Sequence, residues 1–279
     1  MFSTLPGASA PEFRPGLQPR AGITHVIFDF DGTLSWLRHG WPEIMCGLFQ
    51  EHYPARPEES PAAIHDLLLE ELLSLNGKPS IYQMERFVER VRARGAPSPE
   101  PASLLAEYSR RLDARISERT ARVANGTAAP DEYLVHGART IVEQLGKMGL
   151  RLVILSGTIE HGVREEAALL GLSGYFGPHI YGSTADHTQF SKRRVMDRLL
   201  REEGITGANL LAFGDGPVEI EQTKDLGGMA IAVASNETHN GSGVMDEAKR
   251  RQLVAAGADG VIADYRDAET LLPRILIKT

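Results

Sequence analysis

The sequence predicts a doubly wound α/β protein in which an all-helical domain is inserted after the first strand of a parallel sheet. From residue 137 onward, short apolar runs alternate with amphipathic helical segments, and strands separated by helices imply right-handed parallel crossovers. Residues 36–136 show helical periodicity only. We therefore expect a core of residues 21–35 and 137–279, a helical domain of residues 36–136, and a flexible, proline-containing N-terminal arm of residues 1–20.

The individual elements follow from the spacing of apolar residues. An apolar, β-prone run predicts the first strand at residues 24–30. Apolar stripes at helical spacing predict the helices of the insertion at residues 42–52, 60–75, 81–95 and 103–123. In the second half, strands are expected at residues 151–155, 179–181, 209–213, 230–234 and 261–263, and helices at residues 138–148, 159–170, 192–203, 218–226, 247–256 and 268–276.

Composition restricts the class of protein. The chain has 279 residues, of which 42% are hydrophobic, so it can form a substantial core. Its net charge of −7 argues against a general nucleic-acid or anionic-membrane binder. The single cysteine, Cys46, excludes an intrachain disulfide and fits a reducing compartment, and no apolar run reaches the roughly 18 residues of a membrane span. We expect a cytoplasmic protein that acts on a small molecule, and the sequence leaves its oligomeric state open.

Two carboxylates, Asp29 and Asp31, directly follow the first strand, and Gly32-Thr33 then turns the chain. Residues i and i+2 of a strand share one face, and α/β sheets bind ligands at the carboxyl ends of their strands. Two adjacent carboxylates repel each other unless a cation or a shared proton offsets the charge. Asp-x-Asp-Gly also opens calcium loops, but the twelfth residue from Asp29 is Gly40 rather than Glu. The pair therefore indicates a metal-assisted nucleophile site, with a plain strand-to-turn pair of acids as the alternative.

A second signal follows the strand expected at residues 151–155. Ser156 is expected to leave this strand just before a helix begins, so its hydroxyl and the N–H groups of Gly157 and Thr158 would suit a phosphate group. The alternative is that Ser156 or Thr158 is only an N-cap.

Two further signals complete the pattern. Gly214-Asp215-Gly216 places an acid at another strand end, and Glu219 follows one helical turn later, so both acids can face a cation such as Mg²⁺. Alternatively, Glu219 only complements the helix dipole. The run at residues 190–194 is basic, and one of its side chains could offset the charge of a bound phosphate.

Taken together, the four signals resemble the motifs of the haloacid dehalogenase (HAD) superfamily of phosphohydrolases, over nearly all of residues 22–279. The helical insertion directly after the first motif resembles the C1 cap of that superfamily, and the remainder resembles its Rossmann-like core. The resemblance implies a Mg²⁺ cofactor and a phosphorylated small-molecule substrate.

The resemblance also implies a role for each motif residue. Asp29 would be the nucleophile that forms an aspartyl-phosphate, Asp31 the general acid and base, and Lys192, rather than the adjacent Arg193, the catalytic cation. The phosphate would be bound by Gly32, Thr33, Ser156 and Gly157, and Mg²⁺ by Asp29, Asp215 and the backbone carbonyl of Asp31, with Glu219 in support. The family more often has Asp at the position of Glu219, which leaves direct ligation by Glu219 open.

Residues near the insertion are expected to recognise the rest of the substrate. Arg38 lies just past the first motif and could meet an anionic group. Residues 76–80 resemble the substrate-specificity loop of C1 caps, which makes Lys78 the first candidate for a contact and Gln83 the next. The alternatives are ordinary cap packing for Arg38 and a solvated turn for Lys78. The polar segment 235–244 is expected either to edge the site or to be mobile.

The expected function is a Mg²⁺-dependent phosphatase that acts on a small phosphorylated metabolite such as a sugar or polyol phosphate. Asp31 favours phosphoester chemistry, because the dehalogenases and phosphonatases of the superfamily lack an acid at this second position. One alternative is a phosphomutase of the β-phosphoglucomutase type, which shares the cap and motifs but releases no net phosphate. The other is a binding protein on the same scaffold that has lost turnover.

Overall fold

A seven-stranded sheet forms the centre of the structure, a computed structural model that describes residues 8–76, 78–184, 190–236 and 238–277. The strand order is β1-β7-β6-β5-β2-β3-β4, and every neighbouring pair is parallel except β1 and β7. The strands are β1 (Glu12–Phe13), β2 (His25–Phe28), β3 (Arg151–Ile159), β4 (Ile180–Ser183), β5 (Leu210–Gly214), β6 (Met229–Val233) and β7 (Gly260–Ile262). This sheet confirms the predicted doubly wound class.

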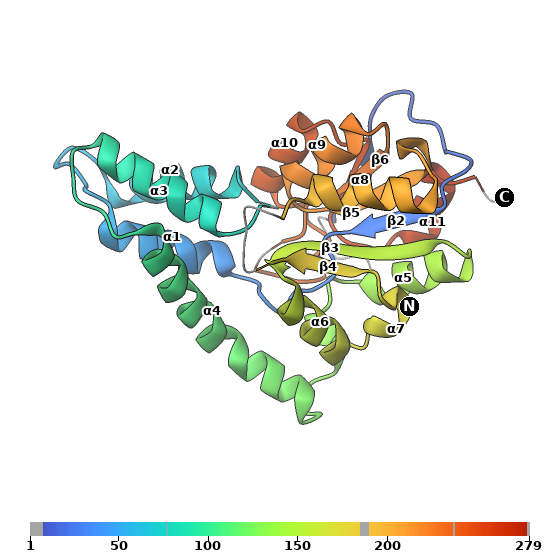
Figure 1. Cartoon of the computed structure of the whole chain (residues 1–279), viewed down its shortest axis with the longest axis horizontal. Coiled ribbons are helices and arrows are strands. Elements are labelled where there is room, and N and C mark those ends of the chain that lie inside the picture. Colours follow the sequence, from blue (N-terminus) through green and yellow to red (C-terminus); the bar gives the residue numbers. More distant parts are fainter. Residues whose placement is uncertain (1–7, 77, 185–189, 237, 278–279) are drawn as a thin grey trace.

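Helices cover both faces of the sheet (Figure 1). One face packs on α5 (Ala138–Lys147), α6 (Glu160–Leu169), α7 (Ser173–Phe176) and α11 (Ala268–Ile275), and the other on α8 (Lys192–Glu203), α9 (Pro217–Asp225) and α10 (Glu247–Ala255). The alternation of side chains along β2 explains the two layers. Val26 and Phe28 belong to the hydrophobic cluster on the face covered by α5, α6, α7 and α11, and Ile27 belongs to a cluster on the other face. Short 3₁₀ helices, η1 (Pro130–Tyr133) and η2 (Gly207–Asn209), connect other elements.

The insertion after β2 is helical, as predicted, and projects to one side of the sheet (Figure 1). It contains α1 (Trp41–His52), α2 (Pro61–Leu73), α3 (Ile81–Ala93) and α4 (Pro101–Ala124). These helices enclose a hydrophobic cluster of their own, in which Phe49 stacks on Phe87 with ring centroids 4.2 Å apart. None of the helices in the described part of the chain is long and apolar enough to cross a membrane.

The two chain segments that connect the insertion to the sheet run side by side. Trp36 N donates to Tyr133 O at 2.8 Å, and Val135 N donates to Leu34 O at 2.9 Å. The polar segment 235–244 packs against both of them, since the indole N–H of Trp36 donates to Asn236 O at 3.2 Å and Asn240 Nδ2 donates to Leu134 O at 2.6 Å. Within this segment, residue 237 lies outside the described residues. The segment therefore ties both connections to the core.

The strand order identifies where a site is expected in this fold. β2 lies between β3 and β5. The later strands β3 and β4 lie on one side of it and β5, β6 and β7 on the other, so the strand order reverses direction at β2. In open α/β sheets, ligands bind at the carboxyl ends of the strands at such a switch point. Asp29 and Asp31 lie at this end of β2.

The structure differs most from the predicted elements at two places. Residues 12–13 of the expected flexible arm form β1, which pairs with β7 in the register Glu12↔Val261. Residues 1–7 of the arm lie outside the described residues. β3 continues to Ile159 instead of ending at residue 155, because its last residue pairs with Ser183 of β4 after a register shift. The short elements β1, α7, η1 and η2 span two to four residues each, too few for apolar periodicity to reveal.

Replacing Phe13 by alanine should reduce the free energy of unfolding by about 1–3 kcal/mol, the range for removing a partly buried aromatic ring. Phe13 packs against the core, and the guanidinium of Arg274 lies 5.3 Å from the centre of its ring. The measurement is urea unfolding of the full chain. As a control, Glu12→Gln removes only a surface ion pair with Arg250 and should cost less than about 1 kcal/mol. Equal stabilities of Phe13→Ala and the unmodified protein would contradict docking of the arm.

Candidate active site

Asp29 and Lys192 form a buried ion pair at the end of β2. The backbone N–H of Asp29 donates to Phe213 O of β5 at 2.9 Å, which fixes the residue just beyond the strand. Lys192 is the first residue of α8, and its Nζ lies 2.8 Å from Asp29 Oδ1 and 3.1 Å from Glu219 Oε2. The lysine therefore bridges two acids that come from distant segments of the chain.

Asp29, Asp215 and Glu219 offer carboxylate oxygens that lie within 4.8 Å of one another, and all three residues are buried. Two glycines make this approach possible. A Cβ on Gly32 would lie 2.2 Å from Asp215 Oδ2, and a Cβ on Gly214 would lie 2.2 Å from Glu219 Cγ. Any larger residue at either glycine would displace an acid of the cluster.

This cluster fits a hard divalent cation such as Mg²⁺. The donors are oxygens, which Mg²⁺ prefers. Asp215 Oδ1 is buried and has no hydrogen-bond partner among the described residues, so it is poised to accept a ligand. Both oxygens of Glu219 are already engaged, Oε1 by Gly216 N at 2.7 Å and Oε2 by Lys192. The observed contacts thus favour Asp215 as a direct ligand and Glu219 as a supporting residue.

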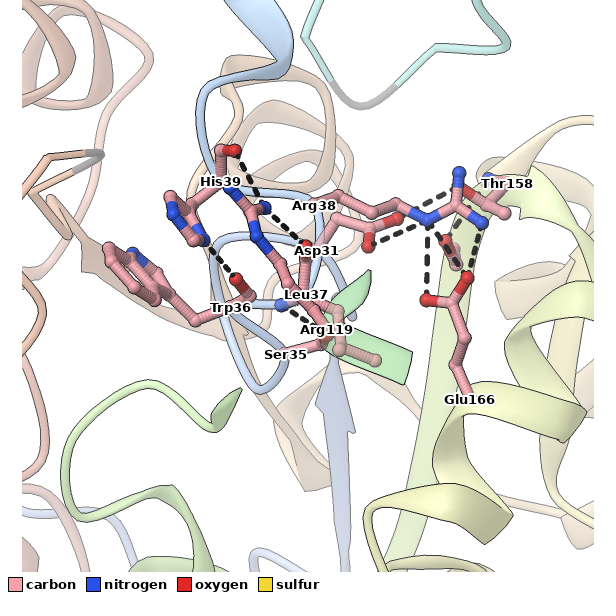
Figure 2. Close-up of polar contacts among 10 residues, drawn as sticks. Asp31, Ser35, Trp36, Leu37, Arg38, His39, Arg119, Thr158 and Glu166 are labelled. Carbon is pink, nitrogen blue, oxygen red and sulfur yellow. Dashed lines mark hydrogen bonds and ion pairs between the residues drawn. The ribbon is translucent and has the colours of Figure 1, made fainter. Parts of the chain in front are cut away.

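Asp31 lies in a different set of contacts, which Figure 2 shows. Its Oδ2 accepts a hydrogen bond from Thr158 Oγ1 at 2.8 Å, and its Oδ1 lies 3.5 Å from Arg38 Nε. Arg38 in turn forms a forked ion pair with Glu166 of α6, with Nε 3.1 Å from Oε1 and Nη2 also paired to it. The carboxyl group of Asp31 is thereby held apart from the cluster formed by the other three acids.

The connecting segment that carries Arg38 is itself fixed on several sides (Figure 2). Arg119 of α4 donates to Leu37 O at 2.7 Å and to His39 O at 3.1 Å. The imidazole of His39 hydrogen-bonds Trp36 O at 2.8 Å and stacks on the indole ring with centroids 3.5 Å apart. These contacts support Arg38 at the junction between the core and the insertion.

The expected phosphate-binding residues lie at this edge of the sheet, but one part of the expectation is wrong. Ser156, Gly157 and Thr158 lie within β3, which runs to Ile159, so Ser156 does not leave the strand directly before a helix as expected, and Ile159 rather than Ser156 or Thr158 is the N-cap of α6. Ser156 Oγ accepts from Thr158 N at 3.1 Å, as in a short polar turn. Thr33 is fully buried, and its hydroxyl has no partner among the described residues.

Burial raises the pKa values of Asp29, Asp31 and Glu219. Burial and, to a smaller extent, the nearby charges of Asp215 and Asp31 raise the pKa of Asp29 to about 6, although the positive charge of Lys192 lowers it. Burial also raises the pKa of Asp31 to about 6, against the attraction of Arg38. The largest effect is on Glu219, where burial raises the pKa to about 8 despite Lys192. Although burial lowers the pKa of Lys192, Asp29 and Glu219 raise it above its usual value.

A cavity of about 400 Å³ lies between this edge of the sheet and the insertion. Asp29, Asp31, Ser156 and Gly157 line its floor, and Arg38 lines it at the junction. Its remaining walls are mixed, with apolar side chains next to polar ones, and the members contributed by the insertion include Trp41, Lys78, Ile81, Gln83, Leu105, Tyr108, Ser109, Leu112 and Asp113. The cavity has the size of a small-ligand site.

The structure brings the predicted insertion residues to this cavity in different ways. Lys78 is exposed and lines the cavity, as does Gln83, whose Nε2 donates to Leu72 O at 3.0 Å. Residue 77 of the expected specificity loop lies outside the described residues. Arg38 also lines the cavity, but its guanidinium is held by Glu166 of the core.

Sequence reasoning missed three contacts of the site. Thr158 was expected to contribute its N–H group or an N-cap, yet its hydroxyl holds Asp31. Glu166 and Lys249 were not singled out at all. Lys249 Nζ lies 2.9 Å from Asp215 Oδ2 and is buried. Its position in the first turn of α10 was the available signal, because the helix dipole disfavours a cation there unless an acid pairs with it.

Most of the chain matches a known protein family. The sequence profile of the haloacid dehalogenase-like hydrolase family matches residues 23–227. No curated protein matches the sequence.

Several solved structures are similar in fold. A haloacid dehalogenase-like protein of unknown function from Agrobacterium tumefaciens is 19% identical, with 90% of this chain and 98% of that chain covered and a TM-score of 0.61. A predicted phosphatase from Clostridium acetobutylicum is 18% identical, with the same coverage and a TM-score of 0.58. A predicted phosphoglycolate phosphatase from Haemophilus somnus is 15% identical, also at 90% and 98% coverage, with a TM-score of 0.57. At these identities the likeness concerns the fold.

The metal-free protein should become less stable as the pH rises from about 5 to about 8.5. The pKa values of Asp29 and Glu219 rise on folding from 3.8 and 4.5 to about 6 and about 8. Because folding raises these pKa values, the two groups stabilise the folded protein fully at a pH below their pKa values in the unfolded chain. This stabilisation is lost as the pH rises past their pKa values in the folded protein.

The measurement is the melting temperature in EDTA across this pH range, repeated with Mg²⁺, which should reverse most of the loss by offsetting the ionised acids. Glu219→Gln removes the group whose pKa is raised to about 8 and should flatten the upper part of the curve. A melting temperature in EDTA that increases as the pH rises across this range would contradict the raised pKa values of Asp29 and Glu219.

Proposed function

The chain belongs to the haloacid dehalogenase-like hydrolases, and we propose that it is a Mg²⁺-dependent phosphatase that hydrolyses a small phosphorylated metabolite through an aspartyl-phosphate on Asp29. The observation that carries this proposal is the placement of Asp29 between Lys192 and the other acids, on the floor of a closed-over cavity. A phosphate monoester hydrolyses extremely slowly in water, and a carboxylate nucleophile divides the reaction into two easier steps.

In the first step, a carboxylate oxygen of Asp29 attacks phosphorus while the bond from phosphorus to the leaving oxygen breaks. Lys192 offsets the repulsion between this carboxylate and the phosphoryl oxygens. A divalent ion held by Asp29, Asp215 and the carbonyl of Asp31 would supply the remaining positive charge and keep Asp29 ionised. Ser156 and Gly157 line the cavity beside Asp29 and, with the Gly32-Thr33 turn, would hold the phosphoryl group.

Asp31 would deliver its proton to the leaving oxygen and then take a proton from the water that hydrolyses the aspartyl-phosphate. This role agrees with a pKa raised by burial to about 6, which lets the group exchange a proton near neutral pH. The Thr158 hydroxyl orients one oxygen of Asp31, and Arg38 faces the other. Hydrolysis frees inorganic phosphate and restores both carboxyl groups.

The walls of the cavity support a sugar or polyol phosphate as the substrate. The faces of Trp41 and Tyr108 can pack against C–H groups, while Ser109 and Asp113 can hydrogen-bond hydroxyl groups. Lys78 places a positive charge on the wall that the insertion contributes, whereas the charge of Arg38 is offset by Glu166. The test of the function is phosphate release from a broad panel of phosphorylated metabolites, with and without Mg²⁺.

Asp29→Asn should reduce phosphate release to below about 1% of the unmodified rate, because the amide cannot act as the nucleophile. The measurement is steady-state phosphate release on the best substrate of the panel, together with a circular dichroism melt to show that the variant folds. Asp197→Asn is the matched control, since Asp197 lies on the exposed face of α8 and pairs only with Arg193 in the observed contacts. Retention of more than about 5% activity by Asp29→Asn would exclude Asp29 as the nucleophile.

Lys78→Ala should raise KM by about fivefold on a polyol phosphate, the effect of losing one partly exposed charged contact, with little change in kcat. It should leave the hydrolysis of a small generic phosphate ester unchanged, because Lys78 lines the wall contributed by the insertion, which only a larger leaving group would contact. Lys147→Ala, an exposed lysine at the end of α5, is the control. Equal losses on both substrates would show that Lys78 does not act in substrate recognition.

A further inference from the structure

A second buried lysine, Lys249, pairs with an acid of the cluster but belongs to none of the four sequence motifs described above. It is the third residue of α10, whose N-cap Asp246 accepts hydrogen bonds from Ala248 N and Lys249 N. Its side chain is 4% exposed, and its Nζ lies 2.9 Å from Asp215 Oδ2. A cation in the first turn of a helix opposes the dipole, and burial adds a desolvation cost, so an acid must compensate for both.

We propose that Lys249 is a built-in counter-ion of the cation site, which pairs with Asp215 and lowers the negative charge that attracts a divalent ion. The inference rests on the proposed function for the presence of a metal ion. Lys249 acts through Asp215 and is therefore a positioning residue rather than a catalytic one.

The contacts of Asp215 support this assignment. Lys249 occupies Oδ2, while Oδ1 is buried and has no hydrogen-bond partner among the described residues. Lys249 Nζ also donates to Ser235 Oγ at 3.3 Å, and that hydroxyl donates to Gly32 O at 2.6 Å. Lys249 thus connects the metal-binding acid to the turn after Asp31, and leaves one oxygen of Asp215 for the ion.

The balance of formal charge at the site supports it further. Among the described residues, the negative charges belong to Asp29, Asp31, Asp215 and Glu219, and the positive charges to Lys192 and Lys249. The nearby pair of Arg38 and Glu166 cancels. With all acids ionised, these six groups carry an excess of two negative charges. Removing Lys249 would raise the excess to three, and unbalanced buried charge is costly.

Lys192 cannot replace Lys249 in this role. Its Nζ pairs with Asp29 and Glu219, at 2.8 and 3.1 Å, whereas that of Lys249 pairs with Asp215. The two lysines therefore serve different acids, and the loss of one leaves its own partner without a cation.

The test is the variant Lys249→Met, which preserves the length of the side chain and removes its charge. Ion binding to the full-length protein is measured by isothermal titration calorimetry at one fixed pH, with Mg²⁺ and separately with La³⁺. Because Coulomb attraction scales with the charge of the ion, we expect binding to tighten by about tenfold for Mg²⁺ and by about thirtyfold for La³⁺. We also expect a lower melting temperature in EDTA and a larger recovery on adding Mg²⁺ than in the unmodified protein.

Two control variants separate charge from packing. Lys249→Arg keeps the charge and should bind both ions with the affinity of the unmodified protein. Lys224→Met removes another lysine with a buried acidic partner, since Lys224 Nζ lies 2.7 Å from Asp259 Oδ2, outside the cluster. It should lower the melting temperature without changing either affinity.

Unchanged or weaker binding of Mg²⁺ by Lys249→Met would overturn the inference, as would equal gains for Mg²⁺ and La³⁺. A variant that folds with Mg²⁺ but not in EDTA would support it. If Lys249→Met folds under neither condition, the same titrations on Lys249→Gln decide the question. An unmodified protein that binds neither ion would overturn both this inference and the proposed function, whereas a protein that binds both ions but releases no phosphate would overturn the proposed function alone.

Discussion

The repulsion among carboxylates buried at the end of β2 is the constraint on which the rest of the site depends. Asp29, Asp215 and Glu219 are buried and offer oxygens within 4.8 Å of one another, where like charges interact strongly. Such a cluster needs cations or bound protons to offset its charge. The fold supplies cations from helix N-termini, with Lys192 at the start of α8 and Lys249 at the start of α10.

The sheet topology explains why acids and lysines meet. In a parallel sheet, the carboxyl ends of the strands and the N-termini of the helices that follow them lie at the same edge. Asp29 follows β2 and Asp215 follows β5, and these strands are neighbours in register, with Phe28 opposite Phe213. One edge of the sheet therefore gathers residues that are nearly two hundred positions apart, without any long loop reaching across the molecule.

Sequence reasoning located the acids because their signal is local: each follows an apolar strand and precedes a turn. It could not locate Glu166, since a charged residue in a helix looks the same whether it faces solvent or a buried partner. It passed over Lys249, for which the only signal was a cation in the first turn of a helix. The end of β3 was misjudged for a related reason, because its extension to Ile159 depends on pairing with β4. β1 likewise has only two residues, and it forms a strand only because β7 offers a free edge.

The contacts of Arg38 connect recognition to proton transfer. Arg38 lies on the first connecting segment, where Arg119 of α4 holds the carbonyls on either side and Glu166 of the core holds the guanidinium. Asp31 faces this guanidinium at 3.5 Å. If the insertion shifts over a bound substrate, the shift passes through this segment. Because Glu166 anchors Arg38 to α6, the environment of Asp31 follows the core rather than the insertion. Under the proposed function, the insertion could therefore select the leaving group while Asp31, the proposed proton donor, keeps its contacts with the core.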